Sequence, residues 1–454
     1  MANKEFDIVV VGAGPAGEVA AGRLAEAGLD VALCERELVG GECSFYACMP
    51  SKALVRPAEL IGEVGRVPGI ELSSDRPTAS AVLARRDEVI HDLDDSAQIP
   101  WVKDRGIELF RVEARLDGER RVIAGDDVLT ARKAVIVATG TTASLPPIPG
   151  LAEADPWTSR EGTTASEVPE SLIVIGGGPV GCELAQAWSS LGSDVVLLEV
   201  APRLISNEEE FASEELTEAL REHGVDVRVP VEITNAAGEN GRVHVTLEGG
   251  ETLEAEKLMV AAGRKPNTGE IGLETVGLPE GDWIDVDDQM RAGGHDWLYA
   301  IGDVNKRSLL THSGKYQARV ACETIMGRDA TAKADANGPP RVTFTDPQIA
   351  AVGLTAEQAA KEGLDVEVLD VSTSGNAGAS FHGNNTPGTS RLVIDNGRGV
   401  IVGATFVGYQ TAELLHSATI AITAEVPLDN LVEAIPAFPT RTEIWLRFLE
   451  KRGL

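Results

Sequence analysis

Two cysteines with four residues between them form the most reactive pattern in the sequence. Cys43 and Cys48 lie in the stretch from Gly40 to Lys52, and the remaining cysteines are more widely spaced, at positions 34, 182 and 322. In a first helical turn, this spacing can bring two sulfurs within bridging distance, and a helix N-terminus lowers the pKa of a thiol. The pattern therefore predicts a redox-active pair rather than two inert buried cysteines. Five cysteines in 454 residues are too few, and an odd number, for a secreted disulfide framework.

Two glycine-rich turns could bind the phosphates of two dinucleotides. Each turn follows a short apolar run and precedes a helical segment, and in each copy the next strand ends at an acid, Glu35 or Glu199. Glycines let backbone N–H groups and a helix N-terminus approach a pyrophosphate, and the acid can accept hydrogen bonds from ribose hydroxyls. One such turn is weak evidence, whereas two copies of the same βαβ unit form an internal repeat. The glycines predicted to bind cofactor in these turns are Gly12, Gly14, Gly17, Gly176, Gly178 and Gly181.

Glu199 also bears on the choice of nicotinamide cofactor. Its carboxylate would repel a 2′-phosphate and therefore favours NADH. Arg203 lies four residues further on and could soften this preference. We expect NADH or NADPH as the electron donor, with NADH favoured.

The strands and helices that must position these residues predict an α/β fold. A C-terminal module of another class follows it. The proline-rich stretch 145–150 and the stretch 337–340 break the chain into parts. Beyond the second break no nucleotide motif is present, and an α+β pattern takes over. We expect strands at 341–344, 365–371, 391–394 and 400–407 and helices at 412–424 and 441–452.

Composition excludes several classes of partner. The formal net charge of −31 argues against nucleic acid, whose phosphates require Lys and Arg, and against an anionic membrane surface. No apolar stretch approaches the length of a membrane span. The apolar run 8–11 leads into glycines rather than into a signal-peptide cleavage site. We expect a cytoplasmic protein that acts on a small molecule.

Taken together, the motifs resemble those of class I pyridine nucleotide–disulfide oxidoreductases, the family of dihydrolipoamide dehydrogenase, glutathione reductase and mercuric reductase. The resemblance covers nearly the whole chain. Beyond the two turns and the cysteine segment with Gly41 and Lys52, it rests on the stretches 138–140, 176–183, 263–267, 300–303 and 344–355.

The resemblance implies FAD as a bound cofactor, a homodimer and no metal site. It implies two Rossmann-like dinucleotide-binding domains and a C-terminal α+β dimerisation domain. The expected boundaries are 1–150 (FAD-binding, first part, with the cysteine pair), 151–272 (NAD(P)-binding), 273–336 (FAD-binding and central, second part) and 337–454 (dimerisation).

The resemblance also implies roles for single residues. Cys48 would stack on the flavin, Cys43 would attack the substrate, and Lys52 would pair with Glu183 beside flavin N5. Asp303 would hold the FAD ribityl chain. Further cofactor contacts would come from Glu35, Gly41, Lys52, Thr139, Gly140, Glu199, Gly263, Arg264 and Gly302.

The chain departs from the family at its C-terminal signature, His-Pro-Thr-x-x-Glu, which the partner subunit gives to the disulfide. Here the sequence reads Phe438-Pro439-Thr440-Arg441-Thr442-Glu443. The family's histidine exchanges the thiol proton and its glutamate orients the ring; phenylalanine can do neither. Glu443 is then either still part of the site or a helix-face acid paired with an arginine. The histidines at 312, 382 and 416 are expected to be structural.

The loss of the histidine at position 438 limits which electron acceptors the protein can reduce. A leaving thiol of low pKa departs without help, whereas an alkyl thiol gains from a general acid. The sequence therefore favours a small disulfide with a good leaving group, such as an ergothioneine-type disulfide. The alternatives are a quinone or a metal ion as acceptor, or dihydrolipoamide chemistry with another acid/base. Mercuric reductase activity is disfavoured because no cysteine follows Cys322, and the intact Cys43, Cys48 and Lys52 argue against a non-catalytic relative.

Overall fold

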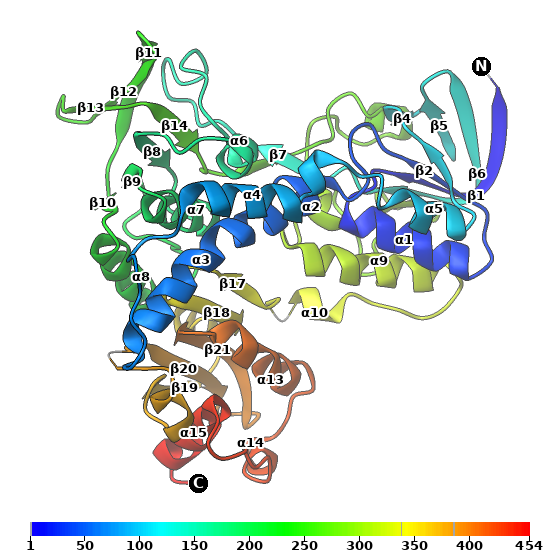
Figure 1. The fold of residues 1–454 in the computed structure, drawn as a ribbon. Helices are drawn as coiled ribbons and strands as arrows, with labels where there is room; N and C mark the ends of the chain where they lie inside the picture. Colours follow the sequence, from blue (N-terminus) through cyan, green and yellow to red (C-terminus); the bar gives the residue numbers. More distant parts are fainter. Residues whose placement is uncertain (1, 337, 385) are drawn as a thin grey trace. The chain divides into compact units, whose positions relative to one another are not determined.

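The computed structural model describes residues 2–336, 338–384 and 386–454 (Figure 1). The chain forms two compact units, each assembled from three separate segments. The first comprises Met1–Pro50, Asp87–Ser144 and Arg264–Ala336, and the second Ser51–Arg86, Leu145–Gly263 and Asn337–Leu454.

The first unit is built on one sheet with the strand order β3-β2-β1-β6-β5-β4, in which β16 also pairs with β6. Strands β3, β2, β1, β6 and β16 are parallel, and β5 and β4 continue the sheet in antiparallel pairing. The strands are β1 (Asn3–Val11), β2 (Val31–Cys34), β3 (Glu108–Phe110), β4 (Ala114–Leu116), β5 (Arg121–Ala124), β6 (Asp127–Val137) and β16 (Leu298–Ala300).

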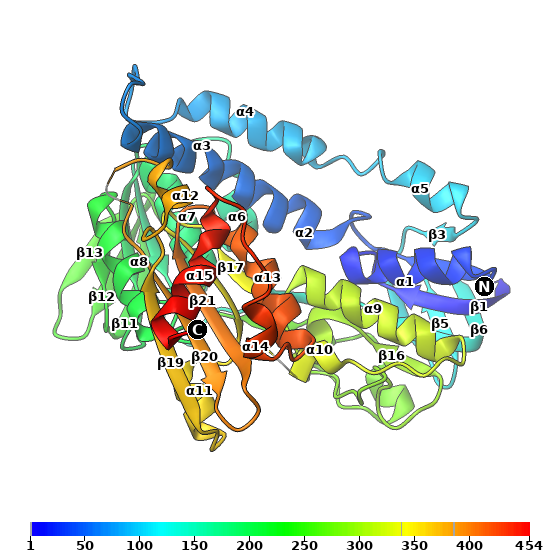
Figure 2. The same cartoon turned by 90° about the horizontal axis from the view of Figure 1, so that it is seen from below.

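Helices α1 (Pro15–Glu26) and α9 (Thr311–Ile325) lie side by side on one face of this sheet (Figures 1 and 2). Their apolar residues join the strands in one buried cluster, and the opposite face of the sheet forms another. Burial on both faces explains why the last four residues of β1 and all of β2 are continuous apolar runs rather than alternating patterns. The carboxyl ends of β1 and β6 and the N-terminus of α1 therefore meet at one edge, where ligands bind in open parallel sheets.

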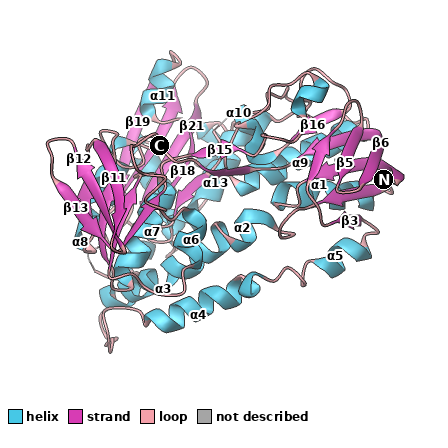
Figure 3. Cartoon of the chain, turned by 90° about the horizontal axis from the view of Figure 1, so that it is seen from above, coloured by secondary structure: helices cyan, strands magenta, loops and turns pink. Residues whose placement is uncertain are grey.

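The second unit contains another parallel sheet, with the order β10-β9-β8-β14, and a three-stranded antiparallel sheet, β11-β12-β13, whose strands are neighbours in Figure 3. Helix α7 (Pro179–Ser190) follows β8 as α1 follows β1. The strands are β8 (Ser171–Ile175), β9 (Asp194–Leu198), β10 (Asp226–Arg228), β11 (Ile233–Glu239), β12 (Arg242–Leu247), β13 (Thr252–Ala255) and β14 (Lys257–Val260).

The C-terminal part of the second unit is a five-stranded antiparallel sheet with the order β17-β18-β21-β20-β19. Helices α13 (Thr411–Thr423) and α15 (Ile444–Arg452) share an apolar cluster with it. The strands are β17 (Arg341–Thr343), β18 (Gln348–Gly353), β19 (Val366–Ser372), β20 (Thr389–Asp395) and β21 (Val400–Gly408), of which β19, β20 and β21 are adjacent in Figure 2.

These sheets confirm the predicted fold class. The predicted C-terminal strands are present with small differences at their ends, and β18 is an additional strand that the sequence pattern did not reveal. The predicted helix 441–452 is divided: a 3₁₀ turn, η4 (Arg441–Glu443), precedes α15. Among the described residues, no helix is both long and apolar enough to cross a membrane.

Candidate functional site

The two acids that end β2 and β9 make the same pair of hydrogen bonds in the two copies of the βαβ unit. Glu35 accepts hydrogen bonds from the backbone N–H of Ala13 at 2.7 Å and of Glu37 at 2.8 Å. Glu199 accepts from Gly177 at 2.5 Å and from Ala201 at 2.7 Å. The internal repeat predicted from sequence therefore extends to individual hydrogen bonds. Each carboxylate is held at the mouth of its glycine turn.

The glycines of the two turns fall into two groups with different physical roles. A Cβ atom on Gly17 would lie 1.9 Å from the Gly12 carbonyl oxygen, and one on Gly181 would lie 1.8 Å from that of Gly176, so helix and strand could not approach each other. By contrast, a Cβ on Gly14 or Gly178 would meet no protein atom within 4 Å. The open space at the helix N-termini fits a pyrophosphate that approaches the backbone closely.

The two cysteines lie in two separate helices rather than in one helical turn, so the predicted local geometry is wrong. Cys43 lies in α2 (Gly41–Phe45), which ends before Tyr46, and Cys48 is the first residue of α3 (Cys48–Arg66). Gly41 has φ +60°, and a Cβ there would lie 2.7 Å from the Cα of Gly14, so the cysteine segment contacts the first glycine turn. A left-handed conformation and a close approach both require glycine here.

Both cysteines of the pair are free thiols in this structure. The thiol of Cys43 interacts with that of Cys48, whose sulfur lies 3.4 Å from the Thr311 hydroxyl. The pKa of Cys43 is raised, first by its hydrogen bond to Cys48 and then by burial, whereas the charge of Lys315 acts in the opposite direction. Contact with Cys48 and burial therefore oppose the lowering of the thiol pKa that is expected at a helix N-terminus. Two adjacent thiols lose their protons in coupled steps, and the second step is disfavoured by the first thiolate.

Lys52, one helical turn after Cys48, is partly exposed and paired with a buried acid. Its Nζ lies 2.5 Å from the Glu183 carboxylate and 4.7 Å from the centre of the Phe344 ring. Glu183 is 5% exposed, and its other oxygen accepts a hydrogen bond from the Phe344 N–H at 2.8 Å. The predicted pair of Lys52 and Glu183 is therefore formed, and its carboxylate is fixed by the backbone.

Arg264 and Asp303 belong to a cluster with Glu42 and Thr141. Arg264 contacts Glu42 and donates from Nε to the Thr141 hydroxyl at 2.6 Å, and that hydroxyl donates to Asp303 at 2.9 Å. Burial raises the pKa of Asp303 above its ordinary value. Sequence reasoning found Arg264 and Asp303 but missed their two partners. Glu42, directly before Cys43, was within the motif, whereas nothing local distinguished Thr141.

The predicted stretches 139–140 and 302–303 follow strands β6 and β16, which pair in parallel. Asn267 donates from Nδ2 to the Thr139 carbonyl and from its backbone to the Gly140 carbonyl, both at 3.0 Å. The Thr139 hydroxyl is buried without a partner among the described residues. A buried donor of this kind, beside the turn of Gly12, fits a site completed by a bound cofactor. Gly263, in the second unit, has φ +145° and open space at its Cβ position.

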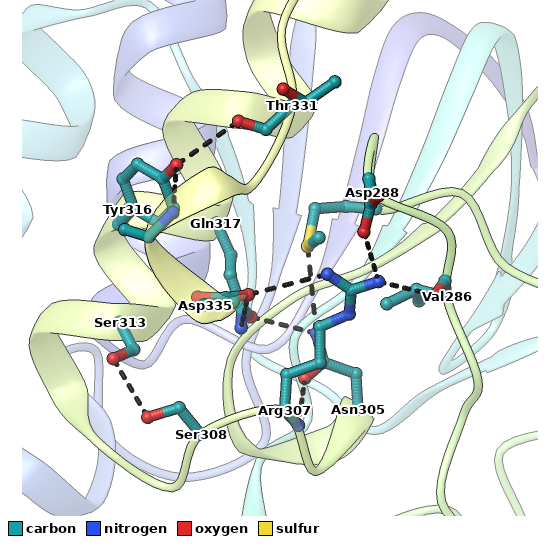
Figure 4. Close-up of polar contacts among 12 residues, drawn as sticks. Val286, Asp288, Asn305, Arg307, Ser308, Ser313, Tyr316, Gln317, Thr331 and Asp335 are labelled. Atoms are coloured by element: carbon teal, nitrogen blue, oxygen red, sulfur yellow. Dashed lines mark hydrogen bonds and ion pairs between the residues drawn. The ribbon is translucent and has the colours of Figure 1, made fainter. Parts of the chain in front are cut away.

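A buried polar network supports the turn that carries Asp303 (Figure 4). Gln317 of α9 is fully buried and accepts hydrogen bonds from the Gly302 N–H and from Asn305, each at 2.9 Å. Its amide donates to Asp335 at 3.0 Å, and Arg307 lies 3.9 Å from the same carboxylate. The network connects the turn η3 (Gly302–Asn305), α9 and the short helix α10 (Lys333–Ala336).

The C-terminal signature residues have opposite environments. Phe438 is 77% exposed, whereas Glu443 is 6% exposed. Glu443 accepts a hydrogen bond from the Gly378 N–H at 3.2 Å. Among the described residues it forms no ion pair with an arginine, so the suggested helix-face pair is not present.

Comparisons with known proteins match this arrangement. The model of the pyridine nucleotide-disulphide oxidoreductase family matches residues 6–323, and that of the family's dimerisation domain matches residues 339–447. A dihydrolipoyl dehydrogenase of Mycobacterium tuberculosis is 35% identical over 462 residues, covering 96% of each chain. A mercuric reductase of Staphylococcus aureus is 29% identical over 445 residues, covering 97% of this chain and 81% of that protein.

A solved structure with the same fold is the HOCl-induced flavoprotein disulfide reductase RclA from Escherichia coli. Its TM-score is 0.87 at 24% sequence identity, and the superposition covers 98% of this chain and 99% of that one. The same protein has also been solved as a Cu(II) complex, which matches with a TM-score of 0.86.

Proposed function

Because the chain belongs to the pyridine nucleotide–disulphide oxidoreductase family, whose members are FAD-containing enzymes, we propose that it is an NAD(P)H-dependent reductase whose electrons leave at the Cys43–Cys48 pair. The proposed acceptor is a small molecule that takes no proton from the C-terminal signature. The observation that carries this proposal is the state of that signature: Phe438 cannot transfer a proton, and Glu443 is buried on a backbone amide.

Residues of both glycine turns fit the two cofactors. We assign FAD to the turn at Gly12 with Glu35, Gly41, Thr139 and Asp303, in a domain that comprises 1–150 and 273–336. We assign the nicotinamide cofactor to the turn at Gly176 with Glu199, in the domain 151–272, and a homodimer interface to 337–454. When bound, FAD would supply a two-electron carrier between the nicotinamide and the disulfide.

Two residues bear on whether the protein prefers NADH or NADPH. Glu199 favours NADH because its carboxylate, held at the glycine turn, would repel a 2′-phosphate on the ribose that it contacts. The Nη1 atom of Arg203, however, is buried without a partner among the described residues, so a cation is available near that position. We propose NADH as the better substrate and NADPH as a slower one.

The proposed chemistry on a disulfide needs two exchange steps. The Cys43 thiolate attacks one sulfur of the substrate, forms a mixed disulfide and expels the other sulfur as a thiolate. The Cys48 sulfur then attacks Cys43, restores the Cys43–Cys48 disulfide and releases the second thiolate. The substrate is reduced by two electrons and the dithiol is oxidised by two.

The first leaving group determines which disulfides can react. A thiolate of low pKa, or one stabilised as a thione, departs without a general acid, whereas an alkyl thiolate departs slowly. We therefore propose an ergothioneine-type disulfide, or another disulfide with a stabilised leaving group. Dihydrolipoamide would be a poor partner.

A thiophilic metal ion is the second candidate acceptor. Several relatives are named mercuric reductases, and RclA has been solved with Cu(II). The two neighbouring thiols of Cys43 and Cys48 offer soft ligands for such an ion. In the described part of the chain, no group of three or more His, Cys, Asp or Glu could hold a metal. The ion would therefore be a transient substrate rather than a resident cofactor.

The test is NAD(P)H oxidation against a panel of disulfides, quinones and metal ions. Cys43→Ser should reduce disulfide turnover by about three orders of magnitude or more, because it removes the attacking nucleophile. The control Cys322→Ala changes a buried cysteine of α9 outside the pair and outside both glycine turns, and it should retain activity. Disulfide reduction retained in Cys43→Ser would exclude the dithiol mechanism. If that variant still reduces quinones, electrons leave the protein before they reach the cysteines.

A further inference from the structure

The loop between strands β17 and β18, residues 344–347, is held along one face of helix α7. The backbone N–H of Phe344 donates to the Glu183 carboxylate at 2.8 Å, and that of Asp346 donates to the side-chain carbonyl of Gln186 at 2.9 Å. Glu183 and Gln186 are three residues apart in α7 and therefore lie on the same face of the helix. Both residues are buried, so these hydrogen bonds are shielded from water. The β17–β18 loop therefore has a fixed position on α7.

The β17–β18 loop is also attached to helix α3, the helix that carries Lys52. The Asp346 carboxylate is buried and accepts hydrogen bonds from Arg66, the last residue of α3, at 3.2 and 3.3 Å. The guanidinium of Arg66 also lies 3.5 Å from the centre of the Tyr409 ring. A Cβ atom on Gly62 would lie 2.5 Å from the same carboxylate, so α3 and the loop are in close contact. Breaking an ion pair with a buried carboxylate is costly, and the attachment is therefore rigid.

These two attachments place the ring of Phe344 over the ammonium of Lys52. The Nζ atom of Lys52 lies 4.7 Å from the centre of the ring, within the range in which a cation is attracted to the negative face of an aromatic side chain. The same ammonium lies 2.5 Å from the Glu183 carboxylate and 3.3 Å from the Ser51 hydroxyl. A lysine side chain has considerable rotamer freedom in solution. Contacts from α3, α7 and the β17–β18 loop together restrict it here.

The aromatic ring at position 344 is not needed for the other contacts of this residue. Any residue except proline supplies the backbone N–H that Glu183 accepts. Phe344 is partly buried and packs against the apolar cluster of the second unit, a contact that leucine could also make. The ring adds its interaction with Lys52 to these two contacts. The residue type at position 344 therefore bears on the lysine and not on the fold alone.

We propose that Phe344 is a positioning residue for the Lys52–Glu183 pair, and that its ring fixes the Lys52 ammonium for its part in reduction of the flavin. This inference rests on the proposed function and on the place beside the flavin that the family resemblance implies for Lys52. A cation fixed there favours the negative charge that a flavin gains on reduction. Phe344 lies in the stretch 339–447 that matches the dimerisation-domain model. This part of the chain would then contribute to the electron path as well as to the proposed interface.

The test is the midpoint potential of the flavin in the full-length FAD-containing protein, measured by chemical reduction in the presence of reference dyes. Phe344→Leu keeps the backbone N–H and an apolar side chain but removes the ring. A cation–π contact contributes a factor of up to about thirty to an equilibrium constant. The potential should therefore fall by up to about 45 mV, the equivalent of that factor for a two-electron couple.

Two further changes at position 344 separate the charge of the ring face from the shape of the side chain. A trifluorinated phenylalanine keeps the shape of the ring but weakens the negative charge of its face, and it should reproduce the fall in potential. Phe344→Tyr keeps the negative face and should retain the wild-type potential.

Two controls separate positioning from packing. Phe211→Leu removes a ring that packs against the same apolar cluster but lies over a different cation, 4.9 Å from the guanidinium of Arg391, and it should leave the potential unchanged. In a Lys52→Met background, Phe344→Leu should cause no further fall, because the two changes remove the same interaction.

An unchanged potential in Phe344→Leu and in the trifluorinated variant, or an equal fall with and without Lys52, overturns the proposal. If Phe344→Leu does not fold, the trifluorinated variant decides the question, since it preserves the shape of the side chain. The rate of flavin reduction by NADH is a second readout: Phe344→Leu should lower the limiting rate and leave the half-saturating NADH concentration unchanged. Failure of both NADH and NADPH to reduce the wild-type flavin would contradict the proposed function. The potentials are measured without nicotinamide and would still test the role of Phe344.

Discussion

At the scale of single residues, the phenylalanine at position 438 affects the transfer of protons in the proposed reaction. The residues that would pass electrons are unaffected. The groups that would pass electrons are in place: Cys43 contacts Cys48, and Lys52 is paired with Glu183. The residues that transfer protons in the family's site differ here. Position 438 is an exposed phenylalanine, and the Glu443 carboxylate accepts a hydrogen bond from the Gly378 N–H. Acceptors that differ only in the basicity of their leaving group should therefore differ strongly in rate.

Phe438→His should restore part of this missing function. A general acid contributes about 10²–10⁴-fold to proton transfer, and the new imidazole would stand at the position where the family's signature has its histidine. We expect at least about a tenfold gain in turnover of dihydrolipoamide, with a bell-shaped pH profile, measured in steady-state assays. Phe438→Leu, which adds no acid, serves as the control. An unchanged rate in Phe438→His would mean that more than one residue has reshaped the substrate site.

Glu18, in the first turn of α1, gives a pH-dependent prediction. Burial raises the pKa of Glu18 from 4.5 to about 7, and the charge of Glu35 acts in the same direction. Between these two values the folded protein binds a proton that the unfolded chain releases, so this group lowers the stability as the pH rises and its full penalty is reached above pH 7.

Glu18→Gln removes that penalty. The expected stabilisation is on the order of 2 kcal/mol at pH 8, after allowance for solvent screening, and clearly smaller at pH 5.5. Denaturant titrations at the two pH values measure it. Glu5→Gln, an exposed acid in β1, should give no comparable dependence on pH. A gain of equal size at both pH values would show that charge repulsion in general, and not the titration of Glu18, is responsible.

At the scale of elements, sequence patterns predicted the parts whose rules are local. The apolar runs, glycine turns and terminal acids correctly predicted the two βαβ units. Glu35 and Glu199 lie at the ends of the strands where this pattern places them. The break between α2 and α3 did not follow from sequence, because the spacing of Cys43 and Cys48 is compatible both with one helical turn and with two helices separated by a break. Thr141 was also missed, since its role depends on Arg264 and Asp303, which are distant in sequence.

The network around Gln317 predicts a link between α9 and cofactor retention. Gln317→Leu would leave the Gly302 N–H buried without its acceptor, at about 1–3 kcal/mol, whereas the Asn305 amide would lose one acceptor and keep the Ala300 carbonyl. We expect a loss of stability of a few kcal/mol and a lower fraction of FAD retained on gel filtration, because the turn that carries Asp303 loses its support. Arg319→Leu, which changes an exposed residue of the same helix, is the control. Normal FAD content in Gln317→Leu would show that the turn is held by its backbone alone.

At the scale of the whole molecule, acidic residues outnumber basic ones, 71 to 40, with a net charge of −31. Even if every cation were paired, a large number of carboxylates would remain without a partner. Salt weakens exposed ion pairs, each of which contributes about 0–1 kcal/mol, but it also screens the repulsion among the uncompensated acids. Because the excess is so one-sided, we expect screening of repulsion to dominate.

The unfolding temperature should therefore rise with ionic strength. Between 0.01 M and 0.3 M NaCl the Debye length falls from about 30 Å to well under 10 Å, so repulsion between distant acids is removed over this range. We expect an increase of several degrees, measured by differential scanning calorimetry at pH 7.5, where the carboxylates are charged. A non-ionic osmolyte at matched osmolality should not reproduce the early part of this rise, because it does not screen charge. A flat or falling curve would mean that ion pairs such as Arg391 with Glu209 and Asp370 contribute more to stability than the excess acid removes.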